Sequence, residues 1–239
     1  MLALDLETLA TAPGGLLCIG AHCDDIEIGC GGTILRLLEL NPALEVHWLV
    51  LCSDDRRRRE GLDAARRFLG DACEKRVRIL SFRDGFLPYQ GSEAKECFES
   101  LKQTLRPGLI LTHFRGDLHQ DHRLVSELTW NTFRDQLILE FEIPKYDGDL
   151  GLPNLFVPLS ARQVERKIAH VLGAFASQRE RRWFSADTFR ALLRLRGVEC
   201  NAPDGYAEAF HVRKLVLAGP EFRFADVQIH PAGEENLNF

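Results

Sequence analysis

Two kinds of segment are missing from this 239-residue sequence, and their absence excludes whole classes of protein. The N-terminal residues M-L-A-L-D-L-E-T-L-A have no basic stretch followed by a long apolar core, so they do not form a secretory signal. No segment approaches the roughly 20 apolar residues that a membrane-spanning helix requires. We therefore expect a cytoplasmic protein without stable membrane insertion.

Positive charge and paired cysteines are also in short supply. The net charge is −5 and the pI about 5.9, so no overall positive field would attract nucleic acid. The seven cysteines are odd in number and include no C-x-x-C pair, which argues against a disulfide framework. With 45% hydrophobic and 27% charged residues, the composition is that of an ordinary globular chain.

Strand-like and helical segments alternate through the first half of the chain, which is typical of β-α-β units. This alternation predicts an α/β fold with a single-domain, Rossmann-like, doubly wound and mostly parallel sheet, covered by helices on both faces. The predicted strands are 16–21, 45–52, 76–82 and 109–114, and the predicted helices are 32–39, 60–69, 93–105 and 121–133.

The second half is less regular, and it contains no linker that would require a second domain. We expect an N-terminal extension at 1–14, one catalytic domain at 15–219 and a C-terminal tail at 220–239. Within the second half, the predicted strands are 138–143, 155–158 and 207–217, and the predicted helices are 160–175 and 185–196.

Ligands of a doubly wound sheet bind beyond the carboxyl ends of its strands, and the first predicted strand ends in a polar motif. The residues A-H-C-D-D at 21–25 place one imidazole and two adjacent carboxylates there. Neighbouring residues on a strand or turn point in different directions, so Asp24 and Asp25 are expected to have different roles. The alternative is that His22 and Asp25 only cap the next helix.

A second polar motif follows the fourth predicted strand, in the segment T-H-F-R-G-D-L-H-Q-D-H-R. Three histidines and two aspartates within ten residues can supply Zn²⁺ with an imidazole ligand, a supporting carboxylate and an acid. The alternative is a solvated polar loop. If the two motifs meet at adjacent strand ends, they provide three protein ligands and leave one coordination position open, as a catalytic zinc requires.

Two other enzyme classes lack their signatures here. The glycines of G-C-G-G-T at 29–33 do not have the G-x-G-x-x-G spacing of a dinucleotide site, and the acids after the second strand are followed by four arginines. No G-x-S-x-G elbow occurs, which argues against a serine hydrolase of that type.

The two polar motifs resemble the signatures of the LmbE-like (PIG-L) family of zinc-dependent N-acetylglucosamine deacetylases, which are A-H-P-D-D and, about a hundred residues later, H-x-D-H. This chain has A-H-C-D-D and H-Q-D-H at a comparable separation. The resemblance implies removal of an N-acetyl group from an amino-sugar conjugate. It further implies that Zn²⁺ is bound by His22, Asp25 and His122, that Asp24 is the general base, that His119 is the acid, and that Asp121 pairs with His119.

Cys23 stands where the family usually has proline, and we expect it to be a tolerated substitution rather than a metal ligand. Two further residues are predicted to bind substrate. Arg58 belongs to the arginine run 56–59, and Asp84 follows the third predicted strand. If the arginines bind a phosphate, the conjugate is nucleotide-linked or lipid-linked.

Alternatives to the amino-sugar deacetylase remain open in the sequence. The same metal site could belong to a deacylase of a non-sugar N-acyl amine. The same fold without catalytic activity could belong to a nucleotide-sugar-binding module. A base and an acid beside the ligands, Asp24 and His119, favour an enzyme. The His-Asp-His set also accepts other divalent ions, and a homo-oligomer is compatible with the sequence.

Overall fold

A seven-stranded sheet runs through the computed structural model, which describes residues 3–70 and 76–217. Its order is β3-β2-β1-β4-β5-β7-β6, in which the first five strands pair in parallel and β7 is antiparallel to both of its neighbours. The strands are β1 (Leu16–His22), β2 (Val46–Cys52), β3 (Val77–Phe82), β4 (Leu109–His113), β5 (Leu137–Phe141), β6 (Leu155–Leu159) and β7 (Tyr206–His211).

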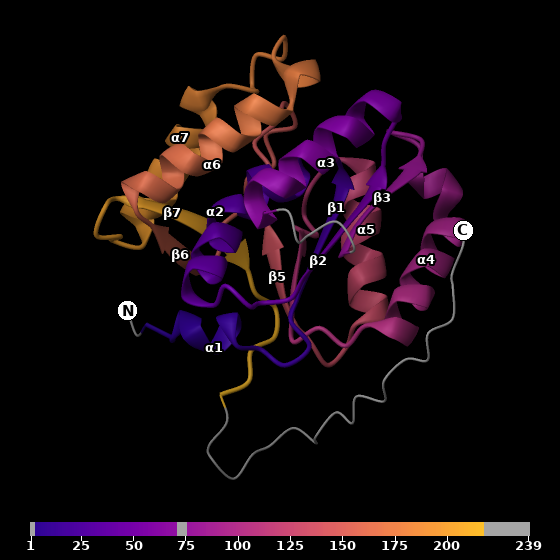
Figure 1. The fold of residues 1–239 in the computed structure, drawn as a ribbon, viewed down its shortest axis with the longest axis horizontal. Coiled ribbons are helices and arrows are strands. Elements are labelled where there is room, and N and C mark those ends of the chain that lie inside the picture. The colour runs from indigo at the N-terminus through magenta and orange to yellow at the C-terminus, as the bar shows by residue number, and fades with distance from the viewer. Residues whose placement is uncertain (1–2, 71–75, 218–239) are drawn as a thin grey trace.

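Helices cover both faces of this sheet (Figure 1). The cluster on one face includes residues of α1, α2, α3, α6 and α7, and the cluster on the other includes residues of α4 and α5. The α-helices are α1 (Leu6–Ala10), α2 (Asp25–Leu40), α3 (Asp55–Leu69), α4 (Gly91–Thr104), α5 (Gln120–Thr132), α6 (Ala161–Ala174) and α7 (Ala186–Glu199), with short 3-10 helices η2 (Leu87–Gln90) and η3 (Ala176–Gln178).

Strand β1 shows why a continuous apolar run becomes a central parallel strand. Leu16 and Cys18 lie in the core cluster on one face, whereas Leu17 and Ile19 lie in the cluster on the other. A strand buried on both faces needs apolar residues at every position rather than at alternate ones. The predicted α/β fold with helices on both faces is therefore confirmed.

Helix α2 begins at Asp25, seven residues earlier than the start predicted at 32. Glycines disfavour a helix interior, so the sequence pattern alone places the start after them. A Cβ on Gly29 would come within 2.3 Å of the Phe141 ring, and one on Gly32 within 2.4 Å of Leu159. The glycines therefore allow α2 to pack closely on β5 and β6.

Other element boundaries differ by a few residues from the predicted ones. Helix α3 begins at Asp55 because Asp54 caps it by accepting a hydrogen bond from the backbone of Arg57. Strand β7 ends at His211 instead of 217. Helix α1 lies within the predicted extension 1–14, and its buried Ala10 joins the core. The predicted tail 220–239 lies outside the described residues, and the domain boundaries remain predictions.

In the part of the chain that the structure describes, no helix has the length and apolar character needed to span a bilayer. The sheet order reverses direction between β1 and β4, which pair side by side. This reversal is the switch point at which doubly wound sheets bind their ligands. Both polar motifs of the sequence follow these two strands.

Candidate metal and catalytic site

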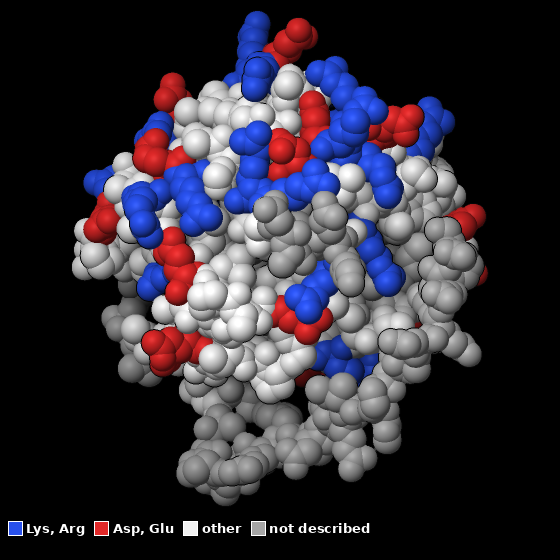
Figure 2. Space-filling model, in the orientation of Figure 1, with Lys and Arg blue, Asp and Glu red and all other residues white. Residues whose placement is uncertain are grey.

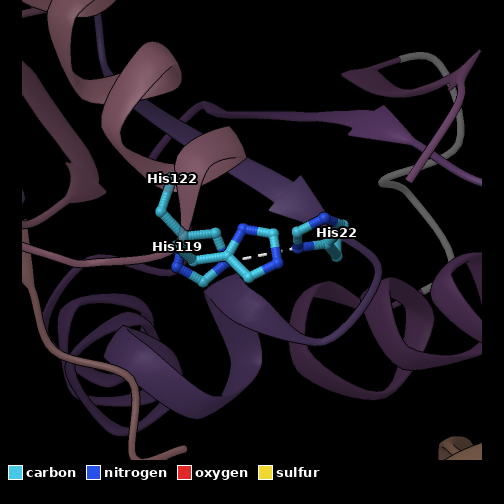
Figure 3. Close-up of side chains that lie close together, drawn as sticks. All are labelled: His22, His119 and His122. Carbon is cyan, nitrogen blue, oxygen red and sulfur yellow. Dashed lines mark hydrogen bonds between the residues drawn. The ribbon is translucent and has the colours of Figure 1, made fainter. Parts of the chain in front are cut away.

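The two sequence motifs meet at the carboxyl ends of β1 and β4. His22 is the last residue of β1, and Asp25 opens α2 directly after it. His119 is the N-cap of α5, and His122 lies in the first turn of that helix. Figure 3 shows the three imidazoles of His22, His119 and His122 gathered at one point, although 97 or more residues separate the first from the other two.

The three residues expected to bind the metal bring one ligand atom each to a common point. His22 Nδ1 lies 3.2 Å from His122 Nε2 and 3.4 Å from Asp25 Oδ2, and the latter two atoms are 3.5 Å apart. Tetrahedral zinc with bonds of about 2.0–2.2 Å separates its ligand atoms by about 3.3–3.6 Å. These side chains therefore fit a small divalent cation.

Each of the two histidines has a carboxylate on its other ring nitrogen. His122 Nδ1 lies 2.9 Å from Asp117, and His22 Nε2 lies 3.0 Å from Asp121. A ring nitrogen that donates to a carboxylate leaves the opposite nitrogen with a free lone pair, which is the arrangement found behind metal-binding histidines. These carboxylates favour the tautomers that leave His122 Nε2 and His22 Nδ1 able to bind a cation. Burial lowers the pKa of His22, but the carboxylates of Asp25, Asp121 and Asp84 outweigh it and hold that pKa well above its ordinary value.

The shifted pKa values of His122 and Asp25 favour the protonation states that bind a cation. Burial lowers the pKa of His122 to about 4, so its ring is neutral at physiological pH. Burial alone would raise the pKa of Asp25, but the imidazoles of His122, His113 and His22 outweigh it and hold that pKa well below its ordinary value. A carboxylate and a neutral imidazole are the forms that bind divalent cations.

Asp24 lies beside this cluster and contacts an arginine. It is 5% exposed, and its Oδ1 accepts a hydrogen bond from Arg57 Nη2 at 2.6 Å. Burial raises the pKa of the Asp24 carboxyl above its ordinary value, and the Arg57 guanidinium opposes that rise. A carboxylate with a raised pKa is a stronger base, which suits it to accept a proton near neutral pH.

The surroundings of His119 differ from the expectation. The Asp121 carboxylate accepts from His22 and from the backbone N–H groups of Gly85 and Leu87, rather than pairing with His119. His119 Nδ1 instead accepts from the backbone N–H of Asp121, because His119 caps α5. Its Nε2 therefore carries the ring proton. Burial and the nearby His22 lower the pKa of His119.

The two residues expected to bind substrate occupy different positions. Asp84 stands at the site, with Oδ1 at 3.1 Å from His22 Nε2 and a side chain that is 79% exposed. Arg58 donates to the backbone carbonyl of Ile79 and not to a residue of the cluster. It is the preceding residue, Arg57, that reaches the Asp24 carboxylate, because helix geometry turns adjacent side chains by about 100°. The role of Arg58 stays a prediction.

Sequence reasoning assigned no role to Arg57, Asp117 or His113. His113 ends β4 and is buried, with Nε2 at 3.2 Å from Asp25 Oδ2 and 2.9 Å from the Ala21 amide. Together with Asp25 and His122 it forms another group of side chains that could hold a cation. The density of His and Asp in the second motif indicated that Asp117 and His113 lie near the site. Nothing in the sequence distinguished Arg57 from the neighbouring arginines.

The Cys23 side chain packs against β2 and α3. Its thiol is buried and lies 3.9 Å from the Cys52 carbonyl oxygen. The sulfur also lies close to Gly61 of α3, where an added Cβ would be only 3.1 Å from it. Burial raises the pKa of the thiol, so the thiolate that would bind a metal is disfavoured. This placement agrees with the expectation that Cys23 is no ligand.

Comparison with known proteins gives a family match over the first half of the chain. Residues 17–133 match the model of PIG-L, described as GlcNAc-PI de-N-acetylase. The diacetylchitobiose deacetylase of Thermococcus kodakarensis is 30% identical over 124 residues. That alignment spans 45% of this chain and 45% of the relative, so less than half of the relative's length is compared.

Solved structures extend the likeness to nearly the whole fold. The N,N'-diacetylchitobiose deacetylase of Pyrococcus horikoshii has a TM-score of 0.65 at 20% identity, covering 88% of this chain and 87% of its own. The 4-carboxy-2-hydroxymuconate hydratase GalB of Pseudomonas putida KT2440 has a TM-score of 0.64 at 17% identity, covering 85% and 98%. The fold is therefore shared by proteins whose names describe two different reactions.

Proposed function

We propose, from the match of residues 17–133 to the PIG-L model, that this chain is a zinc-dependent hydrolase that removes the N-acetyl group from an N-acetylglucosamine-type conjugate. The observation that supports this most strongly is the coincidence of His22 Nδ1, Asp25 Oδ2 and His122 Nε2 within 3.5 Å of one another. A buried carboxylate, Asp24, is the residue immediately before one of these ligands. A module that only binds sugar needs neither feature.

In this proposal Asp24 is the general base that activates the water. A bound Zn²⁺ would polarise the amide carbonyl and lower the pKa of the attacking water. The Asp24 carboxylate accepts the proton of that water, and its raised pKa makes it basic enough to hold the proton. Arg57, bonded to Asp24 Oδ1, fixes the direction in which the carboxylate points.

His119 supplies the donor on the other side of the reacting carbonyl. Because its Nδ1 accepts from the Asp121 amide, the donating atom is Nε2. We propose that this N–H stabilises the developing oxyanion, and that His119 then passes its Nε2 proton to the departing amine while the proton that Asp24 took from the water replaces it. The C–N bond breaks to give acetate and a free amine. Asp84, exposed beside His22, is placed to accept hydrogen bonds from sugar hydroxyls.

We also propose that the conjugate carries an anionic group such as a phosphate. Arginines from two parts of the chain come together, because Glu60 of α3 accepts from the Ser177 backbone N–H at 2.9 Å. Figure 2 shows Lys and Arg side chains gathered over α3 and the region of α6, at the edge where the parallel strands end. The exposed arginines there are Arg56, Arg58, Arg59, Arg179, Arg181 and Arg182.

Acetate release from a panel of N-acetylglucosamine conjugates tests both statements. The panel contains diacetylchitobiose, a phosphate-linked and a nucleotide-linked N-acetylglucosamine, and non-sugar N-acetyl amines. We expect release from the sugars, with a lower KM for the phosphate-bearing ones. Asp24→Asn should lower kcat by about 10²-fold or more while leaving the zinc content unchanged.

The matched control is Asp135→Asn, an exposed aspartate on the loop before β5, which should change neither value. Full activity of zinc-loaded Asp24→Asn would overturn the mechanism. Release from non-sugar amines alone would replace the substrate class, and equal KM values for phosphorylated and plain sugars would remove the anionic group.

A further inference from the structure

A buried ion pair contacts the backbone of α2, the helix that carries Asp25. The Ile28 carbonyl accepts from Lys167 Nζ at 2.6 Å, and the Gly32 amide donates to Glu208 Oε1 at 2.7 Å. The Thr33 amide donates to Glu208 Oε2 at 2.6 Å.

The Lys167 and Glu208 side chains that contact α2 are also bonded to each other. Lys167 Nζ lies 2.6 Å from Glu208 Oε1, and their side chains are 4% and 2% exposed. Lys167 comes from α6 and Glu208 from β7, so both lie beyond the segment 17–133 that matches the family model. The second half of the chain thus reaches into the backbone of the helix that begins at the metal ligand.

Stability alone is a poor reason to keep such a pair. Buried charges lose their hydration, and apolar side chains of similar volume commonly replace a buried pair without loss of stability. Charged side chains that bond to the backbone of a helix fix that helix relative to the elements that carry them. The pair therefore anchors α2 near residues 28–33 to α6 and β7.

The first turn has little other freedom. Asp25 Oδ2 accepts from the His22 amide at 2.6 Å, and Gly29 packs against Phe141 without space for a Cβ. A shift of α2 near residues 28–33 would consequently move the Asp25 carboxylate away from His122, whose Nε2 is 3.5 Å distant. Shifts below one ångström are enough to spoil a tetrahedral ligand set.

We propose that Lys167 and Glu208 are positioning residues of the metal site: their ion pair, bonded to Ile28, Gly32 and Thr33, anchors α2 in the position that places Asp25 beside His22 and His122. Neither residue belongs to the proposed ligand set. The metal-binding part of this inference is independent of the proposed substrate, and only its effect on turnover rests on the proposed function.

The test is the double variant Lys167→Met/Glu208→Gln of the full chain, which removes both charges at nearly constant volume. We expect its Kd for Zn²⁺, measured by competition with a chelator, to rise by about 10-fold or more. The absorption spectrum of the Co²⁺-substituted protein should change, and kcat should fall with KM little altered. Glu208→Gln alone, which keeps one acceptor oxygen, should shift Kd in the same direction by less.

A neighbouring ion pair provides the matched control. Arg196 and Glu142 are as deeply buried, at 4% exposure each, and are joined by bonds of 2.9 and 2.6 Å. Arg196 also bonds to Glu199 and Gly151 rather than to α2. Arg196→Met/Glu142→Gln should lower the melting temperature but leave the Kd for Zn²⁺ and the Co²⁺ spectrum unchanged.

Wild-type Zn²⁺ affinity in the Lys167/Glu208 double variant would overturn the inference, as would an equal loss of affinity in the control. If the double variant does not fold, the Kd of Glu208→Gln decides alone. Zinc binding that responds as expected in a protein that releases no acetate would refute the proposed function and leave the positioning role intact.

Discussion

His22 shows at the scale of a single residue how one ring serves two purposes. Its Nδ1 faces Asp25 and His122, whereas its Nε2 faces the carboxylates of Asp121 and Asp84 at 3.0 and 3.1 Å. The carboxylate side fixes the tautomer and the ring plane, so the other side presents its lone pair in a constant direction. The Asp121 carboxylate therefore orients His22, which differs from the pairing with His119 that the family pattern implied.

This role of Asp121 can be measured. Asp121→Asn should raise the Kd for Zn²⁺ by about 10- to 100-fold, because the amide no longer holds the His22 ring as a charged acceptor. Competition with a chelator gives the value, and Asp135→Asn again serves as the control. Unchanged zinc affinity together with a loss of activity would instead indicate that Asp121 acts on His119.

Arg57 is predicted to control the protonation of the base. The guanidinium opposes the rise of the Asp24 pKa that burial causes, so Arg57→Met should raise that pKa further. A base works only when deprotonated, and the acid limb of the pH profile of kcat/KM should consequently move to higher pH. At pH 7 we expect kcat/KM to fall by about 10-fold or more. Arg67→Met, a surface arginine of the same helix that pairs with Asp63, should leave the profile in place.

At the scale of elements, helix starts carry the site. Asp25 opens α2, and His119 and His122 lie at the cap and first turn of α5, so the side chains of the candidate site lie at helix starts. Residues at helix N-termini have backbone amides that need acceptors, and His119 Nδ1 meets one of them. The same side chain thus completes a helix and faces the reacting centre.

Helix α6 begins with a capping box away from the cation cluster. Ser160 accepts from the Gln163 amide at 3.3 Å, and Gln163 returns a bond to the Ser160 amide at 2.9 Å. Ser160→Ala should lower the free energy of unfolding by roughly 1 kcal/mol without changing kcat. Urea unfolding measures the loss, with the exposed Ser92→Ala as a control. A fall in kcat at full stability would show that α6 influences the site by another route.

At the scale of the whole molecule, buried neutral histidines make stability depend on pH. Burial, with a contribution from Arg196, lowers the pKa of His211 to about 4, and the ring stacks on Phe114 at 3.7 Å. In the unfolded chain its pKa returns to about 6.5. Between these values the unfolded state binds more protons, so stability falls as the pH drops from about 6.5 to about 4.

Replacing this histidine should remove part of that dependence. The urea midpoint of His211→Phe, measured without metal, should decline less steeply over this pH window than that of the wild type. His122, whose pKa is likewise lowered to about 4, should account for some of the remaining slope. A variant with the wild-type slope would mean that His211 is not held neutral by the fold.

The sequence by itself determined the fold class and the meeting of the two polar motifs. Apolar runs such as Leu16 to Ile19 require burial on both faces, and parallel strands joined by helices bring their carboxyl ends to one edge. The two motifs could therefore be expected to meet from the chain alone, whereas the choice of His22, Asp25 and His122 as ligands came from the family resemblance.

Only the tertiary structure decided which side chain faces which. One residue along a helix turns a side chain by about 100°, so nothing in the run of four arginines singled out Arg57 as the partner of Asp24. Asp121 is two residues from His119, the N-cap of α5, yet its carboxylate bonds to His22, 99 positions away. The packing of α2 likewise depends on Phe141, which contacts Gly29. Its backbone also bonds to Lys167 and Glu208. Local patterns record periodicity and propensity, whereas these contacts arise between distant segments that meet only when the sheet is assembled.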